Sequence, residues 1–256
     1  MIDLPAALLI IGAGIAAGTI NAVVGSGSLI TFPVLLFLGF PPLVANVSNT
    51  IGIVPGTISG TLGYRRELVG QRRRAKPLVI GAALGGLTGA GLLLALPASA
   101  FTRVVPVLIL IACALVAIQP RLSRWVMERR AREGSAVHDD GGPVLILGIY
   151  LTGIYGGYFG AAQGVILIAL LTILVDDDIQ RLNGLKNLIA MFINSVAAIV
   201  FILVAPVAWL PALLLAIGST IGGQLGAVVG RRMSPLALRL VIILVGTVVA
   251  IKLLIS

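Results

Sequence analysis

Amide and hydroxyl side chains recur inside segments that are otherwise apolar, and one lysine accompanies them. The candidates are Asn46, Ser48, Asn49 and Thr50 in the first half of the chain, and Asn183, Lys186, Asn187 and Asn194 in the second. Amides inside a membrane must find hydrogen-bond partners, and a lysine there is costly enough to indicate function. The pattern predicts a polar site for a small anionic substrate, with Lys186 as the charge partner. Lys186 lies about one turn into its segment, so an ammonium that reaches out to the membrane interface is the alternative.

The second group of candidates is the stretch Gly25, Ser26, Gly27 and Ser28, inside the apolar run from Leu4 to Phe40. A straight helix over that run would be about 55 Å long, whereas a hydrocarbon core is about 30 Å thick. The run must therefore break, and small residues with hydroxyls favour a turn at this stretch. Irregular backbone at membrane depth is tolerated where it lines a wet cavity, which makes this stretch a candidate substrate site.

A second copy of this stretch occurs later in the chain, where Gly18 aligns with Gly153 and Gly25 with Gly160 at the same separation. The candidate residues of this copy are Gly160, Ala161, Ala162, Gln163 and Gly164. A new helix is expected to begin near Ser28 and near Gly164, and the free N–H groups of a helix start attract anions. Paired interruptions in two halves of a chain are typical of a transporter binding site. The alternative is that these residues only cap helices and allow close packing.

The alignment continues downstream with a slip of two residues, so that residues 45–50 fall on residues 182–187. Asn194 then aligns with Thr57, and Asn194 is expected along the substrate path. Asn21 is a further, less specific candidate.

Composition indicates a membrane protein. The chain of 256 residues is 59% hydrophobic and 11% charged, and its mean hydropathy is +1.13. These values exclude an ordinary soluble domain. The net charge of +9 does not predict nucleic-acid binding, because the arginines lie mainly in short loops between apolar segments, where they orient a membrane protein. The single cysteine, Cys113, predicts neither a disulfide nor a metal site, and we expect no cofactor, no metal and no cleaved signal peptide.

The order of segments predicts an all-α polytopic membrane protein. Apolar segments lie at 4–24, 28–40, 43–64, 77–96, 101–118, 143–160, 164–175, 182–205, 207–229 and 235–255. Basic residues gather at 65–76, at 119–142 and at Arg231 and Arg232. If all three groups are cytoplasmic, 143–175 must enter and leave by one face, and 4–40 must do the same from outside.

Each half is then a broken, re-entrant helical hairpin plus three transmembrane helices, and the two halves are inverted repeats. Eight conventional transmembrane helices are the alternative count. The expected organisation is a first transmembrane repeat at 1–118, a cytoplasmic basic linker at 119–142 and a second transmembrane repeat at 143–256. A solvated linker, with a short interfacial helix around Trp125 as the alternative, divides the repeats.

All nine carboxylates fall in loops or at the ends of apolar segments. The usual buried acidic proton relay is therefore missing, and a proton-coupled mechanism would need Lys186 or the substrate to carry the proton. An anion that leaves a cell with a negative interior needs no such relay, since ~100 mV supplies roughly 2.3 kcal/mol per charge.

The duplicated glycine-rich segment, the element Ala45-Asn-Val-Ser-Asn-Thr50 and the basic helix end Gly63-Tyr64-Arg65 resemble the sulfite exporter TauE/SafE family, also called DUF81 or TSUP permeases. The resemblance runs from about residue 8 to 254. It implies transport of sulfite, sulfoacetate, sulfonates or related sulfur oxyanions. The second copy departs from the family pattern, because it has Ala161-Ala162-Gln163 and no proline.

We therefore expect a secondary transporter or facilitator, with export as the direction, for a small sulfur oxyanion in the bacterial inner membrane. Its partners are the anion and the lipid bilayer, with no nucleic acid; a homo-oligomer stays open. A membrane subunit that acts with a partner protein is the first alternative. An intramembrane serine hydrolase is the second, but the single histidine, His138, lies in the polar loop, away from any buried serine. The predicted protein is not an enzyme and has no catalytic residues.

Overall fold

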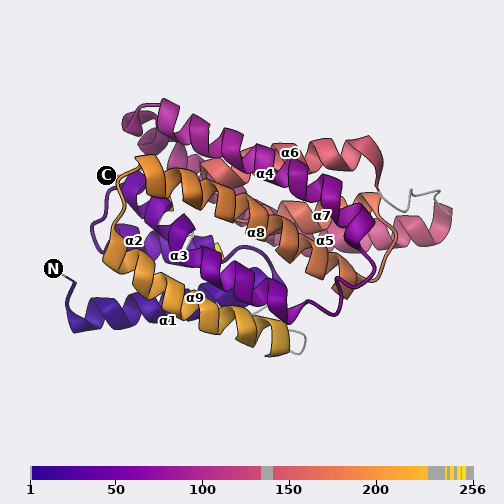
Figure 1. Cartoon of the computed structure of the whole chain (residues 1–256), viewed down its shortest axis with the longest axis horizontal. Coiled ribbons are helices and arrows are strands. Elements are labelled where there is room, and N and C mark those ends of the chain that lie inside the picture. Colours follow the sequence, from indigo (N-terminus) through magenta and orange to yellow (C-terminus); the bar gives the residue numbers. More distant parts are fainter. Residues whose placement is uncertain are drawn as a thin grey trace.

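The computed structural model of the chain describes residues 2–133 and 141–229, together with scattered residues between 240 and 251. This part of the chain is all-helical (Figure 1). Its helices are α1 (Leu4–Val23), α2 (Ser28–Phe37), α3 (Pro42–Gly63), α4 (Arg72–Ala95), α5 (Ala98–Glu133), α6 (Gly142–Tyr158), α7 (Gln163–Leu174), α8 (Ile179–Val204) and α9 (Trp209–Val229). The elements agree closely with the predicted apolar segments, and both predicted interruptions separate two helices.

Helices α1 and α2 form the first hairpin, and α6 and α7 form the second. Leu38 and Phe40, just after α2, line one surface groove together with Ile2 and Ala6 at the start of α1. In the second hairpin, Gly148 of α6 packs against the side chain of Leu170 of α7. Each pair of helices therefore folds back on itself, as the sequence predicts for a re-entrant segment.

The two hairpins open at opposite ends of the molecule. The open end of the first hairpin lies beside Trp209, at the start of α9. The open end of the second lies at Asp177, whose carboxylate receives hydrogen bonds from Arg74 and Arg181, each at 2.8 Å. The loop at 65–76, with its arginines and Lys76, lies on this second side, and we therefore call it the basic end. The start of α6 lies at the same end. Opposite openings are the arrangement that inverted repeats predict.

Each hairpin packs its first helix along a helix of the other half. Helix α1 lies along α9, and α6 lies along α4 (Figure 1). Glycines allow both contacts: Gly18 of α1 touches the backbone of α9, and Gly85 of α4 touches the backbone of α6. Small residues let helices approach closely where no hydrophobic effect drives them together. The two halves thus interlock in one body, with α3 and α8 between the two pairs.

Five helices of the described residues are long and apolar enough to cross a membrane: α1, α4, α5 as far as Arg121, α8 and α9. Helices α2 and α7 have 10 and 12 residues, too few for a span of about 20. Helix α3 has 22 residues but is not among the five; it buries Asn46, Ser48, Asn49 and Thr50 in the centre of the molecule. The chain is therefore a multi-pass membrane protein with a polar central helix.

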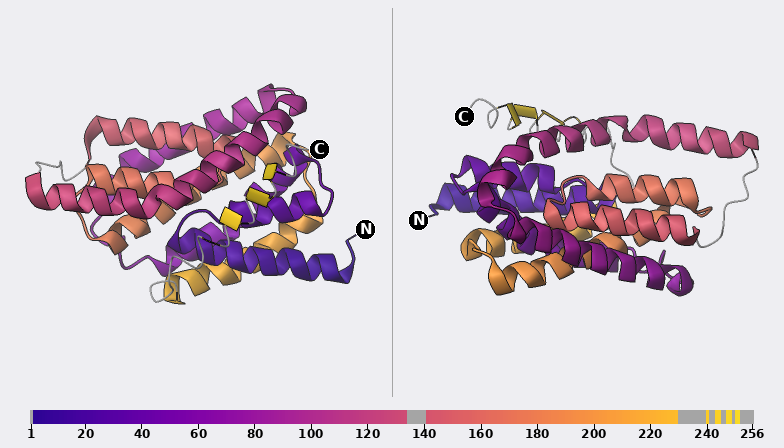
Figure 2. Two further views of the ribbon diagram at one scale, coloured as in Figure 1. Left: turned by 180° about the vertical axis from the view of Figure 1, so that it is seen from behind. Right: turned by 90° about the horizontal axis from the view of Figure 1, so that it is seen from above.

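The first part of the predicted linker is helical, because α5 continues through Pro120 to Glu133. This extension projects beyond the rest of the bundle (Figure 2). The sequence from 119 to 133 contains arginine, leucine and glutamate, which favour helix and explain why α5 continues. A helix around Trp125 was the alternative that the sequence left open, and the cytoplasmic linker at 119–142 stays a prediction. The division into repeats at 118 and 143 stays a prediction, and Arg231 and Arg232 lie outside the described residues.

Candidate functional site

The first hairpin turns at Gly25. Helix α1 ends at Val23, and Gly25 has a φ of +88°, a left-handed conformation that favours glycine. The amide oxygen of Asn21 accepts a hydrogen bond from the Gly27 N–H at 2.6 Å, and α2 begins at Ser28. The helix end therefore leaves carbonyl groups without helical partners in the middle of the protein.

The second hairpin turns at Gly160 and Ala162, with φ values of +77° and +59°. Helix α6 ends at Tyr158 and α7 begins at Gln163. An alanine in the left-handed conformation costs about 1 kcal/mol, which the surrounding packing must offset. The sequence difference noted in this copy thus leaves the turn in place but builds it partly from a non-glycine residue.

The two turns touch each other. The Gly164 N–H donates a hydrogen bond to the Gly25 carbonyl oxygen at 3.0 Å, and a Cβ added at either glycine would overlap the backbone of the other. The Gly27 N–H is likewise taken, by Asn21. These two N–H groups, which the sequence suggested as anion donors, thus have protein acceptors in this structure.

A cavity of about 20 Å³ lies beside the contact of the two turns. We call it the central cavity. Its walls come equally from the two halves: Asn21, Ala22, Gly25, Gly56, Thr57 and Gly60 from the first, and Gln163, Gly164, Lys186, Asn187, Ala190 and Asn194 from the second. A cavity of this size holds about one water molecule. The aligned residues Thr57 and Asn194 both line it.

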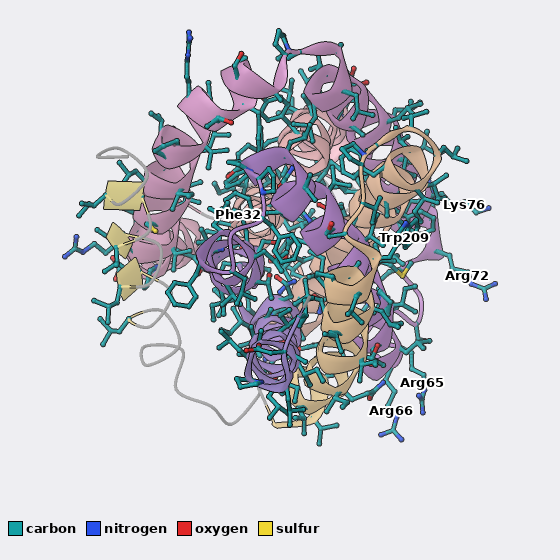
Figure 3. All side chains as sticks on the ribbon, turned by 90° about the vertical axis from the view of Figure 1, so that its left-hand side faces the viewer. Phe32, Arg65, Arg66, Arg72, Lys76 and Trp209 are labelled. Atoms are coloured by element: carbon teal, nitrogen blue, oxygen red, sulfur yellow. The ribbon has the colours of Figure 1, made fainter. Side chains whose placement is uncertain are left out.

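Lys186 is the one charged side chain that is buried among the described residues, with 1% of its surface exposed. Its ammonium faces three backbone carbonyl oxygens at the end of α1, those of Asn21 at 3.4 Å, Ala22 at 3.2 Å and Val23 at 3.4 Å. The side-chain amide of Asn187 donates to the Ala22 oxygen at 3.1 Å. Lys186 therefore does not reach the membrane interface. By contrast, Arg65, Arg66, Arg72 and Lys76 project outward at the rim of the bundle (Figure 3).

Gln163 and Asn194 form a second polar part of the wall of the central cavity. The Gln163 amide donates to the Asn194 side-chain oxygen at 2.8 Å. The side-chain oxygen of Gln163 is buried and has no hydrogen-bond partner among the described residues. A buried polar atom without a partner is rare in proteins, and here it leaves one acceptor for a water or a solute.

Several predicted site residues lie outside the central cavity and form hydrogen bonds within and between α2 and α3. Ser28 accepts a hydrogen bond from Asn49 at 3.3 Å, and Asn49 also accepts one from Thr31. The hydroxyl of Thr50 bonds to a backbone oxygen one turn earlier in α3. The bonds of Asn49 to Ser28 and Thr31 tie α2 to α3, whereas the Thr50 bond stays within α3.

The remaining predicted residues also lie apart from the central cavity. Ser48 accepts from the Ala208 N–H at the corner before α9, and Ser26 is buried, with no partner for its hydroxyl in the described part of the chain. Gly160, Ala161 and Ala162 form the second turn, whose Ala161 oxygen accepts from the Tyr155 hydroxyl. Gly27 precedes α2, and Asn183 is half-buried. None of these lines the central cavity.

Asn46 has a role that the sequence did not indicate. Its amide donates to the Tyr158 carbonyl oxygen at 3.1 Å, so a residue of α3 holds the end of α6, just as Lys186 and Asn187 of α8 hold the end of α1. The cavity residues Ala22, Gly56, Gly60 and Ala190 were also missed, because small apolar residues give no chemical signal in a sequence.

The comparisons with known proteins agree with this architecture. The family model described as "Sulfite exporter TauE/SafE" matches residues 10–253. The chain is 24% identical over 238 residues to "Probable membrane transporter protein YfcA" of Escherichia coli K12, across 93% of this chain and 86% of that protein. It is 26% identical over 229 residues to a "Probable membrane transporter protein" of Haemophilus influenzae, across 88% and 85%. No solved structure matches it significantly.

The family match spans nearly all of the chain, including both hairpins, the polar helix α3 and the lysine of α8. The broken hairpins that meet at a buried polar cavity fit the transport role named for its relatives. The chain belongs to the TauE/SafE family of membrane transporters.

Proposed function

We propose that this chain carries a small sulfur-containing oxyanion, such as sulfite or an organosulfonate, across the bacterial inner membrane, with export as its net direction. The observation that carries the proposal is the position of Lys186, whose buried ammonium lies on the wall of the central cavity between the two turns. A buried cation with no carboxylate in the same cavity favours a negatively charged solute.

The substrate site we propose comprises the side chains of Lys186, Asn187, Gln163 and Asn194 together with the backbone at Gly25 and Gly164. The donors are the ammonium and the amides, which suit the oxygen atoms of an oxyanion. The other predicted residues lie outside the central cavity. The central cavity holds about one water molecule, so a sulfur oxyanion must widen it. The contact between Gly25 and Gly164 is the place where such widening would separate the halves.

Export follows from the membrane potential if the carrier is uncoupled. A cell interior that is negative by ~100 mV drives each negative charge outward with roughly 2.3 kcal/mol. The family description supports sulfite as the substrate, whereas the names of the relatives give no substrate.

The experiment is uptake and efflux in proteoliposomes that contain the purified protein. The panel is sulfite, thiosulfate, sulfate, sulfoacetate and methanesulfonate, with chloride and acetate as controls without a sulfur oxyanion. We expect flux of at least one sulfur oxyanion well above that of empty liposomes, and no flux of acetate. Flux of none of the sulfur compounds, by protein that is folded and correctly inserted, would contradict the proposal.

A further inference from the structure

The end of α1 has the geometry of a cation site. The carbonyl oxygens of Asn21, Ala22 and Val23 converge on one point, where the Lys186 nitrogen lies 3.2 to 3.4 Å from each. Carbonyl oxygens are ligands for hard cations, and the carboxyl end of a helix carries a partial negative charge. In transporters with broken helices, such ends and the unwound carbonyls beside them coordinate the coupling ion.

In this chain the cation at that point is covalently attached. Lys186 belongs to α8 of the second half, and its side chain crosses to α1 of the first half. Asn187 supports the same group from the next position by donating to the Ala22 oxygen. No carboxylate lines the central cavity, so the carbonyl groups are the negative groups in contact with the ammonium in the described structure.

We propose that the Lys186 ammonium is a tethered cation that permanently occupies the place where a free sodium or potassium ion would otherwise bind. The transport cycle then requires neither ion, because each would have to displace the lysine. The ammonium also stands on the wall of the central cavity, where it contributes the positive charge that a bound metal ion would supply to an anion. The flux part of this inference rests on the proposed transport function; the binding part does not.

The second hairpin shows that the broken-helix architecture alone does not create such a site. The corresponding end of α6 is held by the neutral amide of Asn46, and the ring of Phe159, just beyond it, packs on Phe32 and Phe101. We therefore infer one tethered cation in each chain, at the end of α1.

The first test uses the wild-type protein. Anion flux is measured in proteoliposomes with sodium, potassium or N-methylglucamine as the only cation on both sides. We expect equal rates within about twofold, since RT ln 2 is a free energy of only about 0.4 kcal/mol. A requirement for sodium or potassium would overturn the proposal.

The second test removes the tether. The Lys186→Ala variant should lose flux by at least about tenfold, the effect of one lost charge-assisted hydrogen bond. Methylammonium chloride or sodium chloride should restore part of this flux, while N-methylglucamine chloride, whose cation is too large, should not. Lys76→Ala is the matched control, because Lys76 is exposed at the basic end and should respond to none of these salts.

The third test needs no transport substrate. A cation that binds the folded Lys186→Ala protein must raise its thermal unfolding midpoint by mass action. We expect methylammonium to raise the midpoint of Lys186→Ala and leave that of the wild type unchanged relative to N-methylglucamine. Equal responses of the two proteins would overturn the tethered cation even if sulfur oxyanions are transported. Should the variant fail to fold, the wild-type ion dependence decides.

Discussion

The ends of α1 and α6 are equivalent in architecture and different in chemistry. Both helices break in the middle of the protein, and both offer their last carbonyl groups to a polar side chain from the other half. At α1 the partners are the ammonium of Lys186 and the amide of Asn187, beside the central cavity. At α6 the partner is the amide of Asn46, and rings of Phe32, Phe101 and Phe159 pack beside it.

This difference separates two roles that a duplicated sequence element can take. A neutral amide suffices to satisfy a carbonyl group, so the end of α6 needs no charge. A lysine at the end of a broken helix adds a full positive charge and costs free energy of desolvation. A neutral amide would satisfy the carbonyl group without that cost, so the lysine indicates a role beyond holding the helix end. Under the proposed function, the first break serves a charged solute, while the second serves packing.

The largest effect is expected at the contact of the two turns. Gly25 and Gly160 both have a positive φ, so alanine costs about 1 kcal/mol of strain at either position. At Gly25 the new Cβ would also overlap the backbone of Gly164, whereas at Gly160 the nearest atom is the Gly156 oxygen of the same hairpin, at 2.9 Å. Gly25→Ala should abolish flux and folded yield in detergent, and Gly160→Ala should reduce them partially.

The control for this pair is Gly39→Ala. Gly39 has a φ of +86°, and a Cβ there would meet nothing within 4 Å, so this variant reports backbone strain alone. Equal losses for Gly25→Ala and Gly39→Ala, measured as thermal unfolding midpoints, would show that the two turns do not touch in the protein.

The next largest effect is expected from Lys186→Met, which keeps an unbranched side chain one atom shorter than lysine and removes its charge. Flux should fall at least about tenfold, because the substrate loses a charge-assisted contact of about 1.5–3 kcal/mol. The free energy of unfolding should change by no more than about 1–2 kcal/mol, because the desolvation cost that methionine avoids offsets the lost bonds to the α1 carbonyl oxygens. The measurement is initial flux per folded protein in proteoliposomes. Unchanged flux would confine Lys186 to holding the end of α1.

Asn46→Leu tests the neutral end in the same way. The variant leaves the Tyr158 carbonyl without its partner, so the free energy of unfolding should fall by about 1–2 kcal/mol. Flux per folded protein should fall by less than about threefold, because Asn46 does not line the central cavity. A flux defect as large as that of Lys186→Met would remove the distinction between the two helix ends.

The smallest effect is expected at the open end of the second hairpin. Burial raises the pKa of the Asp177 carboxyl. Hydrogen bonds from Arg74 and from the Asp178 N–H, together with the nearby Arg181 guanidinium, lower this pKa by more, so it lies below its ordinary value. A depressed pKa contributes stability that is present above the unfolded-state pKa, about 3.9, and is lost as the pH falls through the folded-state pKa.

Asp177→Asn should therefore reduce the free energy of unfolding by about 1 kcal/mol at pH 7, and the difference from wild type should decline as the pH falls below about 4 and vanish below the folded-state pKa. Asp178→Asn is the control, because asparagine also caps a helix such as α8, so this change should cost less. Thermal unfolding at several pH values measures both. A difference that persists in acid would show that the ion pairs do not stabilise the hairpin.

The sequence determined where the helices begin and break. The length of an apolar run can be compared with the thickness of a bilayer from the sequence alone. The runs at 4–40 and 143–175 are too long for one straight span and had to be interrupted, and Gly25 and Gly160 marked the positions of the breaks. The alignment of the two halves also matched Asn194 with Thr57 and pointed to Asn194 as a residue of the substrate path. The composition of residues 119–133 did not distinguish a helix from a linker, because a basic helix and a basic linker contain similar residues.

Only the tertiary structure decided which polar groups meet. Lys186 and Asn187 cross to the end of α1, Asn46 crosses to the end of α6, and Ser48 turns away to the corner before α9. These partners are more than a hundred residues apart in the sequence. Their pairing depends on how closely the glycine-lined helices of the two halves approach, and no spacing within one segment encodes that distance.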